Sequence, residues 1–318
     1  MDGILKCKNY FHGNHLDLFA ESDKYLISRF RLPRLVLTEL CDTLEPVLRS
    51  HTRRLNPVPP HVQIICTLGF LATGTFQREL ADWVGISQPS ISRALPRVVD
   101  GIHQLATQYI SFPYRPQQQL PVKRGFYTIA GLPNIIGAIG CTRVRIKAPS
   151  PDPFPYLNSK QFHKINVQLI CNAQYHLLNV VSCFPGGAHD SYILQNSSVG
   201  DRGYALAPWL MMPLVDPQTP HETSYNQSHP RTRSTIKRTI RILKGRWMCL
   251  GIAGGELLHT PEKVCRIIMA CCVLHNMAMN RAVPLPPQPP LQDVYLDPLQ
   301  GPENRIAVQV RQQIISHL

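Results

Sequence analysis

Acidic side chains that follow a predicted β-strand are the first candidates for chemistry in this sequence. Asp190 comes after the apolar run Leu177–Cys183 and a Gly-Gly turn, in FPGGAHDSYIL, and Asp201 begins DRGYALAPWLMMPL. Hydrolysis of a phosphodiester by two divalent ions needs several carboxylates from different elements, which hold the ions about 4 Å apart. For either aspartate alone, a solvated turn residue is the commoner explanation. The pair becomes a catalytic and metal-binding candidate only if other elements add carboxylates.

A second candidate is a helix-turn-helix in Phe76–Val99, with the sequence FQRELADWVGISQPSISRALPRVV. Such a motif needs a small residue where the helices touch, a glycine in the turn and a branched apolar residue on the second helix. Ala81, Gly85 and Ile91 supply these residues at the spacing of that motif. An ordinary helical hairpin, in which the glycine only ends the first helix, is the alternative interpretation.

The second helix of this motif carries the candidate DNA contacts. Ser87 can cap the helix, and Pro89 is tolerated in its first turn. The residues expected on its exposed side are Gln88, Ser90, Arg93 and Arg97. The first three lie near the N-terminus of the helix, where a recognition helix meets base edges, and the last is placed to meet a phosphate.

A basic segment at residues 231–246 is the third candidate. Its apolar stripe predicts a helix anchored in the core and consists of Ile236, Ile240, Leu243 and Trp247. Its basic residues are Arg231, Arg233, Lys237, Arg238, Arg241, Lys244 and Arg246. We predict backbone contacts to DNA from Arg238, Arg241 and Lys244, with a solvated helix face as the alternative. Residues that could extend this surface are Tyr156, Lys160, His163 and Lys164.

Composition limits the class of protein. The formal charge of +13, from 33 Lys and Arg against 20 Asp and Glu, favours a polyanionic partner such as nucleic acid. The most apolar stretch, Val264–Met279, contains Arg266 and His275, so we expect no membrane span. The N-terminal sequence does not resemble a secretory signal. The ten cysteines include no Cys-x-x-Cys pair, which predicts reduced, mostly buried thiols and no structural zinc site.

The pattern of elements predicts an α/β protein. The expected helices are Asp23–Phe30, Arg34–Leu48, those of residues 61–112, Arg233–Trp247, Pro261–Met279 and Ile306–Ile315. The expected strands are Ile135–Ile139, Arg143–Lys147, Asn166–Cys171 and Leu177–Cys183. The tail that contains PLPPQPPLQ is expected to be extended and loosely attached. A small all-α module therefore precedes an α/β domain.

Several runs resemble the Harbinger transposase-derived nuclease family, in the same order along residues 25–280. They are LGFLATGTFQ, GISQPSISR, GLPNIIGAIGCTRVRIKAP, HDSYILQNSS, DRGYALAPWLMMPL, YNQSHPRTRSTIKRTIRILKGRW and PEKVCRIIMACCVLHNM. The resemblance implies an N-terminal helix-turn-helix module followed by an RNase H-like mixed-sheet catalytic domain of the DDE type. In that domain Asp, Asp, Asp and Glu bind Mg²⁺ or Mn²⁺ for DNA cleavage.

Carried over residue by residue, the family pattern is incomplete in this chain. The first-strand Asp, in a GAIDCTHV-like run, corresponds to Gly140, and the helical Glu, in an IERTF-like run, corresponds to Lys237. Asp190 and Asp201 remain. Between them the family has a longer segment with a WLLGD-like strand, where this chain has only QNSSVGD, so the placement of Asp201 is open. A divalent metal is then expected to bind weakly or not at all.

The resemblance also sets the expected organisation and partners. We predict a DNA-binding region at residues 1–120, an RNase H-like nuclease domain at residues 125–282 and a proline-rich tail at residues 283–318. The expected partners are DNA and a Myb/SANT-like nuclear protein, with no membrane and no small-molecule cofactor. The expected location is the nucleus, with the cytoplasm.

Three functional hypotheses remain open at this stage. The family favours a metal-dependent DNA endonuclease. The residues found at positions 140 and 237 favour a catalytically inactive protein that binds DNA or a protein partner on the same scaffold. The missing strand leaves open a decayed product that does not fold stably.

Overall fold

The computed structural model describes residues 21–49, 57–150, 152–157, 161–188, 211, 213–214, 216–286 and 305–318. The chain divides into two compact units. The first contains residues 1–109, 145–147 and 242–289, and the second contains residues 110–144, 148–241 and 290–318. The functional boundaries expected near residues 120 and 282 stay predictions, and the two units are described separately below.

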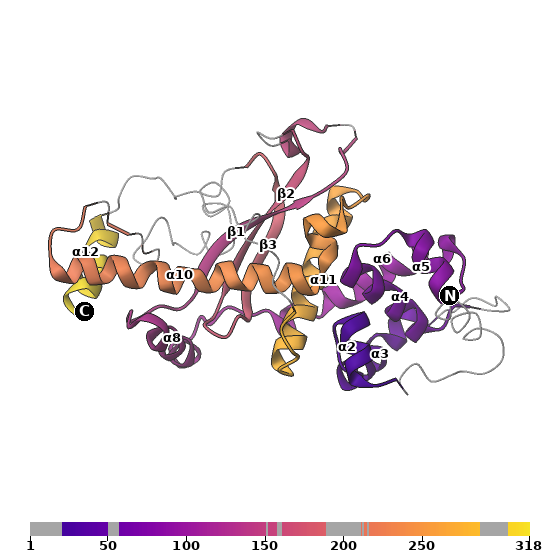
Figure 1. Cartoon of the computed structure of the whole chain (residues 1–318), viewed down its shortest axis with the longest axis horizontal. Helices are drawn as coiled ribbons and strands as arrows, with labels where there is room; N and C mark the ends of the chain where they lie inside the picture. The colour runs from indigo at the N-terminus through magenta and orange to yellow at the C-terminus, as the bar shows by residue number, and fades with distance from the viewer. Residues whose placement is uncertain are drawn as a thin grey trace. The chain divides into compact units, whose positions relative to one another are not determined.

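The first unit is helical. Its α-helices are α2 (Asp23–Phe30), α3 (Arg34–Leu48), α4 (Pro60–Thr73), α5 (Gln77–Val84), α6 (Gln88–Gln104), α7 (Ala106–Tyr109) and α11 (Pro261–Asn280), and its 3-10 turns are η3 (Met248–Leu250) and η4 (Ile252–Gly254). The helices expected at residues 23–30 and 34–48 are confirmed with these bounds. In Figure 1 the first helices are the indigo and purple coils.

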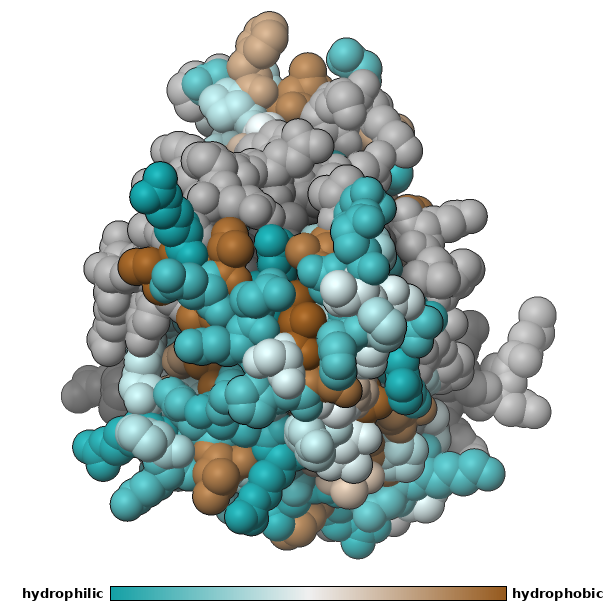
Figure 2. All heavy atoms as spheres, turned by 90° about the vertical axis from the view of Figure 1, so that its left-hand side faces the viewer, coloured by the Kyte–Doolittle hydropathy of each residue, from teal (hydrophilic) through white to brown (hydrophobic). Residues whose placement is uncertain are grey.

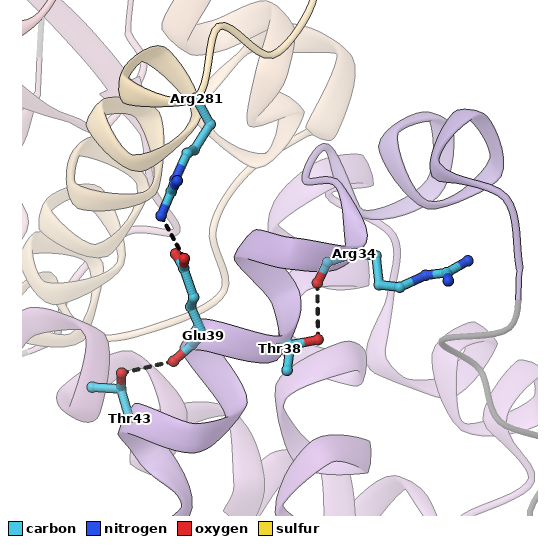
Figure 3. Close-up of polar contacts among 5 residues, drawn as sticks. All are labelled: Arg34, Thr38, Glu39, Thr43 and Arg281. Carbon is cyan, nitrogen blue, oxygen red and sulfur yellow. Dashed lines mark hydrogen bonds and ion pairs between the residues drawn. The ribbon is translucent and has the colours of Figure 1, made fainter.

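Helices α3 and α6 approach each other closely at a glycine. A Cβ atom added to Gly101 of α6 would lie 2.9 Å from Cδ2 of Leu44 on α3, so α3 contacts α6 where α6 has no side chain. An ion pair joins α3 to the end of α11, because Arg281 contacts the carboxylate of Glu39 (Figure 3). On α3 itself the hydroxyls of Thr38 and Thr43 donate to backbone carbonyls four residues earlier.

The second unit contains a three-stranded sheet and its flanking helices. Its elements are α8 (Pro116–Ala130), β1 (Ala138–Arg145), η2 (Phe154–Tyr156), β2 (Lys164–Cys171), β3 (Leu177–Pro185), α10 (Pro220–Arg246) and α12 (Arg305–Ser316). The strand order is β1-β2-β3, and β2 pairs with β3 in antiparallel fashion, with Gln168 opposite Val181. β1 ends at the border of the unit, and α10 continues beyond it.

The strand prediction needs one correction. The runs Ile135–Ile139 and Arg143–Lys147 were expected to form separate strands, but a single strand, β1, begins inside the first run and ends inside the second. Gly140 lies inside this strand and is buried. A glycine weakens a strand, so its presence in the sequence suggests that the strand ends there. Hydrogen bonds to a neighbouring strand can nevertheless keep the strand continuous across the glycine.

Helix α10 also begins earlier than expected, at Pro220 rather than near Arg233. Pro230 inside the helix removes one backbone donor, which is why the sequence pattern predicts a later start. The first turn is held by Glu222, whose carboxylate accepts the N–H groups of Gln218 and Thr219 at 2.7 and 3.0 Å. Hydrogen bonds of 2.8 Å in both directions between Asn226 and the backbone of Leu214 anchor the next turn.

The C-terminal helix α12 packs into the second unit. Ile314 and Ile315 form a buried cluster with Leu132 and with Tyr225 of α10. The helix expected at residues 306–315 is therefore confirmed, whereas most of the proline-rich run PLPPQPPLQ lies outside the described residues. The face of the molecule that carries α12 and the start of α10 is mainly hydrophilic, with hydrophobic side chains in separate small areas (Figure 2).

The architecture confirms an N-terminal helical module followed by a mixed α/β domain. In the second unit α10 crosses the strands of the sheet in the view of Figure 1. Burial raises the pKa of Cys171 on β2 to about 12, and a hydrogen bond with Thr239 of α10 partly offsets this rise. Within the described ranges, no helix has both the length and the hydropathy that crossing a membrane requires.

Candidate nuclease site and nucleic-acid interface

The two remaining candidate carboxylates, Asp190 and Asp201, lie outside the described residues. The backbone that leads to Asp190 is described as far as Ala188. The side-chain amide of Asn166 donates to the carbonyl of Ala188 at 3.2 Å. A Cβ atom on Gly186 would lie 2.4 Å from the carbonyl oxygen of Lys164, so the end of β3 packs on β2 only because this residue is glycine. The first glycine of the Gly-Gly turn is therefore structurally required.

The two replaced positions of the family pattern are both described. Gly140 is buried in β1 and offers no ligand atom, and Lys237 is half-buried on α10 and offers an ammonium group. Among the described residues, no group of three or more His, Cys, Asp or Glu side chains is arranged to hold a metal ion. Mg²⁺ and Mn²⁺ are bound chiefly through carboxylate oxygens. The side chains at these two positions therefore do not fit a two-metal centre.

Lys237 belongs to a row of cations on α10. Arg233, Lys237 and Arg241 follow one another at intervals of four residues, and all three are half-buried. Within the described part of the chain, Lys237 has no hydrogen bond or ion pair, and Nε of Arg241 is buried without a hydrogen-bond partner. Like charges four residues apart destabilise a helix. The neighbouring charges of Lys237 and Arg241 therefore disfavour the helix, and a bound anion would relieve this repulsion.

The remaining basic residues of α10 have contacts within the protein. The guanidinium of Arg238 lies over the ring of Tyr175, 5.1 Å from its centroid, and Arg231 donates to the carbonyl of Ile129 at 3.1 Å. Lys244 is only 6% exposed, which leaves little of its ammonium available to a phosphate. The predicted apolar stripe of Ile236, Ile240, Leu243 and Trp247 is confirmed, because all four side chains are buried.

In the first unit, α5 and α6 have the predicted helix–turn–helix layout. Gly85 ends α5 in the left-handed conformation, with φ of 77°, and its N–H donates to the carbonyl of Ala81 at 2.8 Å. Ala81 and Ile91 are buried between the helices as the motif requires. Ser87 occupies the N-cap position of α6, but its hydroxyl contacts the hydroxyl of Ser90 at 2.8 Å rather than a backbone amide.

Three exposed or half-exposed polar residues near the start of α6 make side-chain hydrogen bonds to neighbouring residues. The amide of Gln88 donates to the side chain of Gln77 on α5 at 2.9 Å, and Arg93 donates to Ser90 at 3.4 Å. The sequence reasoning did not identify Gln77, which orients Gln88. Arg97 instead donates to the carbonyls of Val47 and Leu48 at 3.3 and 2.9 Å, and so caps the end of α3.

The cysteine residues do not contribute to a site in the described part of the chain. Nine of them are free thiols, and most are buried. Burial raises the pKa of the thiols of Cys66 and Cys41 to about 12. Such thiols stay protonated near neutral pH, and only the thiolate is an effective metal ligand or nucleophile. The prediction that most of the cysteines are buried is confirmed for the described part of the chain.

Comparison with known proteins identifies the class of this chain. Residues 139–276 match the DDE superfamily endonuclease family. The HARBI1 protein of Bos taurus, named as a candidate nuclease, is 36% identical over 94% of this chain and 89% of its own length. HARBI1 of Xenopus laevis is 33% identical over 98% of this chain and 97% of its own length. The Arabidopsis thaliana protein named antagonist of like heterochromatin protein 1 is 24% identical over 69% of this chain. No solved structure matches the chain.

The matched residues include nearly all of β1, all of β2, β3 and α10, and most of α11, so these elements belong to a DDE-type endonuclease domain, a class whose members generally use divalent metals. The chain belongs to the Harbinger transposase-derived nuclease family. The resemblance inferred from its sequence motifs is thus confirmed.

Proposed function

We propose that this chain is a member of its nuclease family that binds DNA without cutting it. One observation carries the proposal: the position where the family pattern has a glutamate holds Lys237, a half-buried ammonium group with no partner in the described residues. An ammonium at the edge of a metal centre repels Mg²⁺ but attracts a phosphate. The same position that excludes the metal can therefore hold the DNA backbone.

The geometry of α10 supports a backbone contact at this row of cations. Residues four apart on a helix are separated by about 6 Å along its axis. Phosphates on one DNA strand follow at about 3.4 Å along the duplex axis, and because the strand also winds around this axis, neighbouring phosphates are about 7 Å apart. The row Arg233, Lys237 and Arg241 can thus meet successive phosphates of one strand, and exposed Arg238 can add a further contact. Buried Lys244 is not part of this proposed surface.

We assign recognition of the DNA base sequence to the first unit. We propose that α6 enters the major groove and that Gln88, Ser90 and Arg93 contact base edges, because recognition helices use their first turns for this purpose. The contacts Gln77–Gln88 and Ser90–Arg93 support this assignment, since side chains that are already held in position lose less entropy on binding.

Salt dependence tests the proposal as a whole. The full-length chain is expected to bind duplex DNA in EDTA, and contact with about six phosphates would lower its affinity about 1,000-fold between 50 and 200 mM salt. Arg93→Ala is expected to cost about 1–3 kcal/mol on a preferred sequence, measured by fluorescence anisotropy. Exposed Arg124 on α8 provides the control Arg124→Ala, which should bind normally. Binding that does not respond to salt, or that is unchanged in Arg93→Ala, would contradict the assignment.

The backbone contact of Lys237 has its own test. Lys237→Gln removes the charge and is expected to weaken metal-free binding about three- to tenfold on every sequence. The slope of log affinity against log salt should fall by about 1, because one phosphate contact is lost. Lys263→Gln, at an exposed lysine of α11, is the matched control. An unchanged slope in Lys237→Gln would remove this residue from the interface.

A nuclear location that depends on a partner follows from the same reasoning. The basic run of α10 is a poor import signal because its apolar stripe is packed, so we propose that a Myb/SANT-like protein carries the chain into the nucleus. A fluorescent fusion should lose nuclear enrichment when that partner is depleted. A fusion that still accumulates in the nucleus without the partner would show that the chain is imported independently.

A further inference from the structure

An aromatic side chain stands on a rigid turn close to the start of the candidate nuclease site. Phe154 is 81% exposed, the largest value among the large hydrophobic side chains of the described residues. It begins η2, between Pro153 and Pro155. Because proline fixes its own backbone and restricts the residue before it, this phenyl ring is presented to solvent by a stiff segment. An exposed phenyl ring does not by itself add to the stability of the fold.

The turn is built against the strand end that leads to Asp190. The N–H of Gly187 donates to the carbonyl of Pro155 at 3.0 Å, and a Cβ atom on Gly187 would lie 2.9 Å from that carbonyl oxygen. An antiparallel bridge between Leu157 and His163 closes the other side of the turn. The backbone of η2 is thus fixed to the Gly-Gly turn, whose second glycine lies three residues before Asp190. In the sequence, this feature is marked by Phe154 between two prolines.

We propose that Phe154 stacks on an unpaired or unstacked nucleobase of DNA held at the second unit. This inference rests on the proposed DNA-binding function and adds to it a preference for distorted DNA. Phenylalanine rings inserted beside bases are a common device of proteins that bend or open a duplex, and stacking accepts every base because each has a π-face. The preformed turn lowers the entropy lost when the ring inserts. The nearby carboxylate of Asp152 disfavours a contact with the DNA backbone at this point, which leaves the ring directed at a base.

Two DNA molecules separate this contact from general DNA binding. One is a fully paired duplex, and the other is the same duplex with a central bubble of unpaired bases. The full-length chain in EDTA is expected to prefer the bubble. Phe154→Ala should weaken binding to the bubble by about five- to 150-fold, the range measured when a stacked aromatic is removed, and should leave binding to the paired duplex unchanged. Tyr127→Ala, at an aromatic residue of α8 that is 60% exposed, is the control and should keep the preference.

The outcomes distinguish this inference from the proposed function. If the unmodified chain binds the paired duplex but Phe154→Ala loses nothing on the bubble, the stacking contact is wrong and the DNA-binding proposal stands. If the unmodified chain binds neither DNA, both fail. Phe154→Trp should retain the preference for the bubble. The fluorescence of 2-aminopurine placed in the bubble should be quenched by the unmodified chain and by Phe154→Trp, but not by Phe154→Ala. An alanine variant that loses only association with another protein would assign the ring to a protein contact and overturn the inference.

Discussion

The unmodified chain is expected to leave DNA uncut in Mg²⁺ or Mn²⁺, at a rate no higher than the background without protein. In-line displacement at phosphorus by two metal ions requires a paired clamp on the attacking and leaving oxygens. Two carboxylates hold at most one hydrated ion weakly, since Mg²⁺ dehydrates reluctantly. Lys237 adds a like charge to the same region. The measurement is conversion of supercoiled plasmid to nicked or linear DNA over several hours.

The double variant Gly140→Asp, Lys237→Glu changes the charge of the site by three units and is expected to raise its affinity for Mn²⁺ at least tenfold. Asp190→Asn in that background should reverse the gain. Cleavage itself should return only if Asp201 is also in place, so insertion of a WLLGD-like strand before Asp201 is the second step. An unchanged Mn²⁺ affinity in the double variant would show that these two positions do not belong to a metal site.

Replacing Arg246 by methionine is expected to lower the free energy of unfolding by about 3 kcal/mol. This guanidinium is 1% exposed, and it donates to the carbonyl of Arg31 at 3.3 Å and to those of Val283 and Pro284 at 3.4 Å. Burial lowers the pKa of Arg246 to about 10, and the charge of Arg31 contributes, so the group stays protonated at neutral pH. Its partners lie at the C-terminal ends of α2 and α11, where the helix dipoles are negative.

The loss in Arg246→Met would come from carbonyls left without a donor at these helix ends. Urea unfolding followed by tryptophan fluorescence measures it. Arg238→Met, at an exposed position of the same helix, is the matched control and should change stability by less than about 1 kcal/mol. Equal stability of Arg246→Met and the unmodified chain would mean that the buried charge costs as much as its hydrogen bonds contribute.

The elements with a strong local signal could be predicted from the sequence. Helix α2 has Ser22 as a cap and helix α4 ends at Gly74 in the left-handed conformation, and both features belong to single residues. The division of β1 into two expected strands had a different cause. Gly140 interrupts the run of β-branched residues, which suggests two strands. The strand is continuous because it pairs within the sheet, and the local sequence does not encode this pairing. The early start of α10 likewise depends on tertiary contacts of Tyr225 and Asn226.

The candidate site was predictable as a set of residue types but not as contacts. The spacing of Ala81, Gly85 and Ile91 located the helix–turn–helix, because that geometry is local. The carbonyls that engage Arg97 come from about fifty residues away in the chain, and the burial of Lys244 depends on how α10 packs. Neither could be read from spacing. The exposure of Phe154 could not be predicted either, because large apolar side chains are usually buried.

Calorimetric titration of the purified full-length chain with Mn²⁺ and then Mg²⁺ tests most directly the claim that this family member binds DNA without metal-dependent cleavage. We expect no saturable heat of binding up to millimolar metal and the same DNA affinity in EDTA as in Mg²⁺. Saturable binding of two ions, lost in Asp190→Asn and accompanied by Mg²⁺-dependent DNA cleavage, would contradict it and return the chain to the active nucleases of its family.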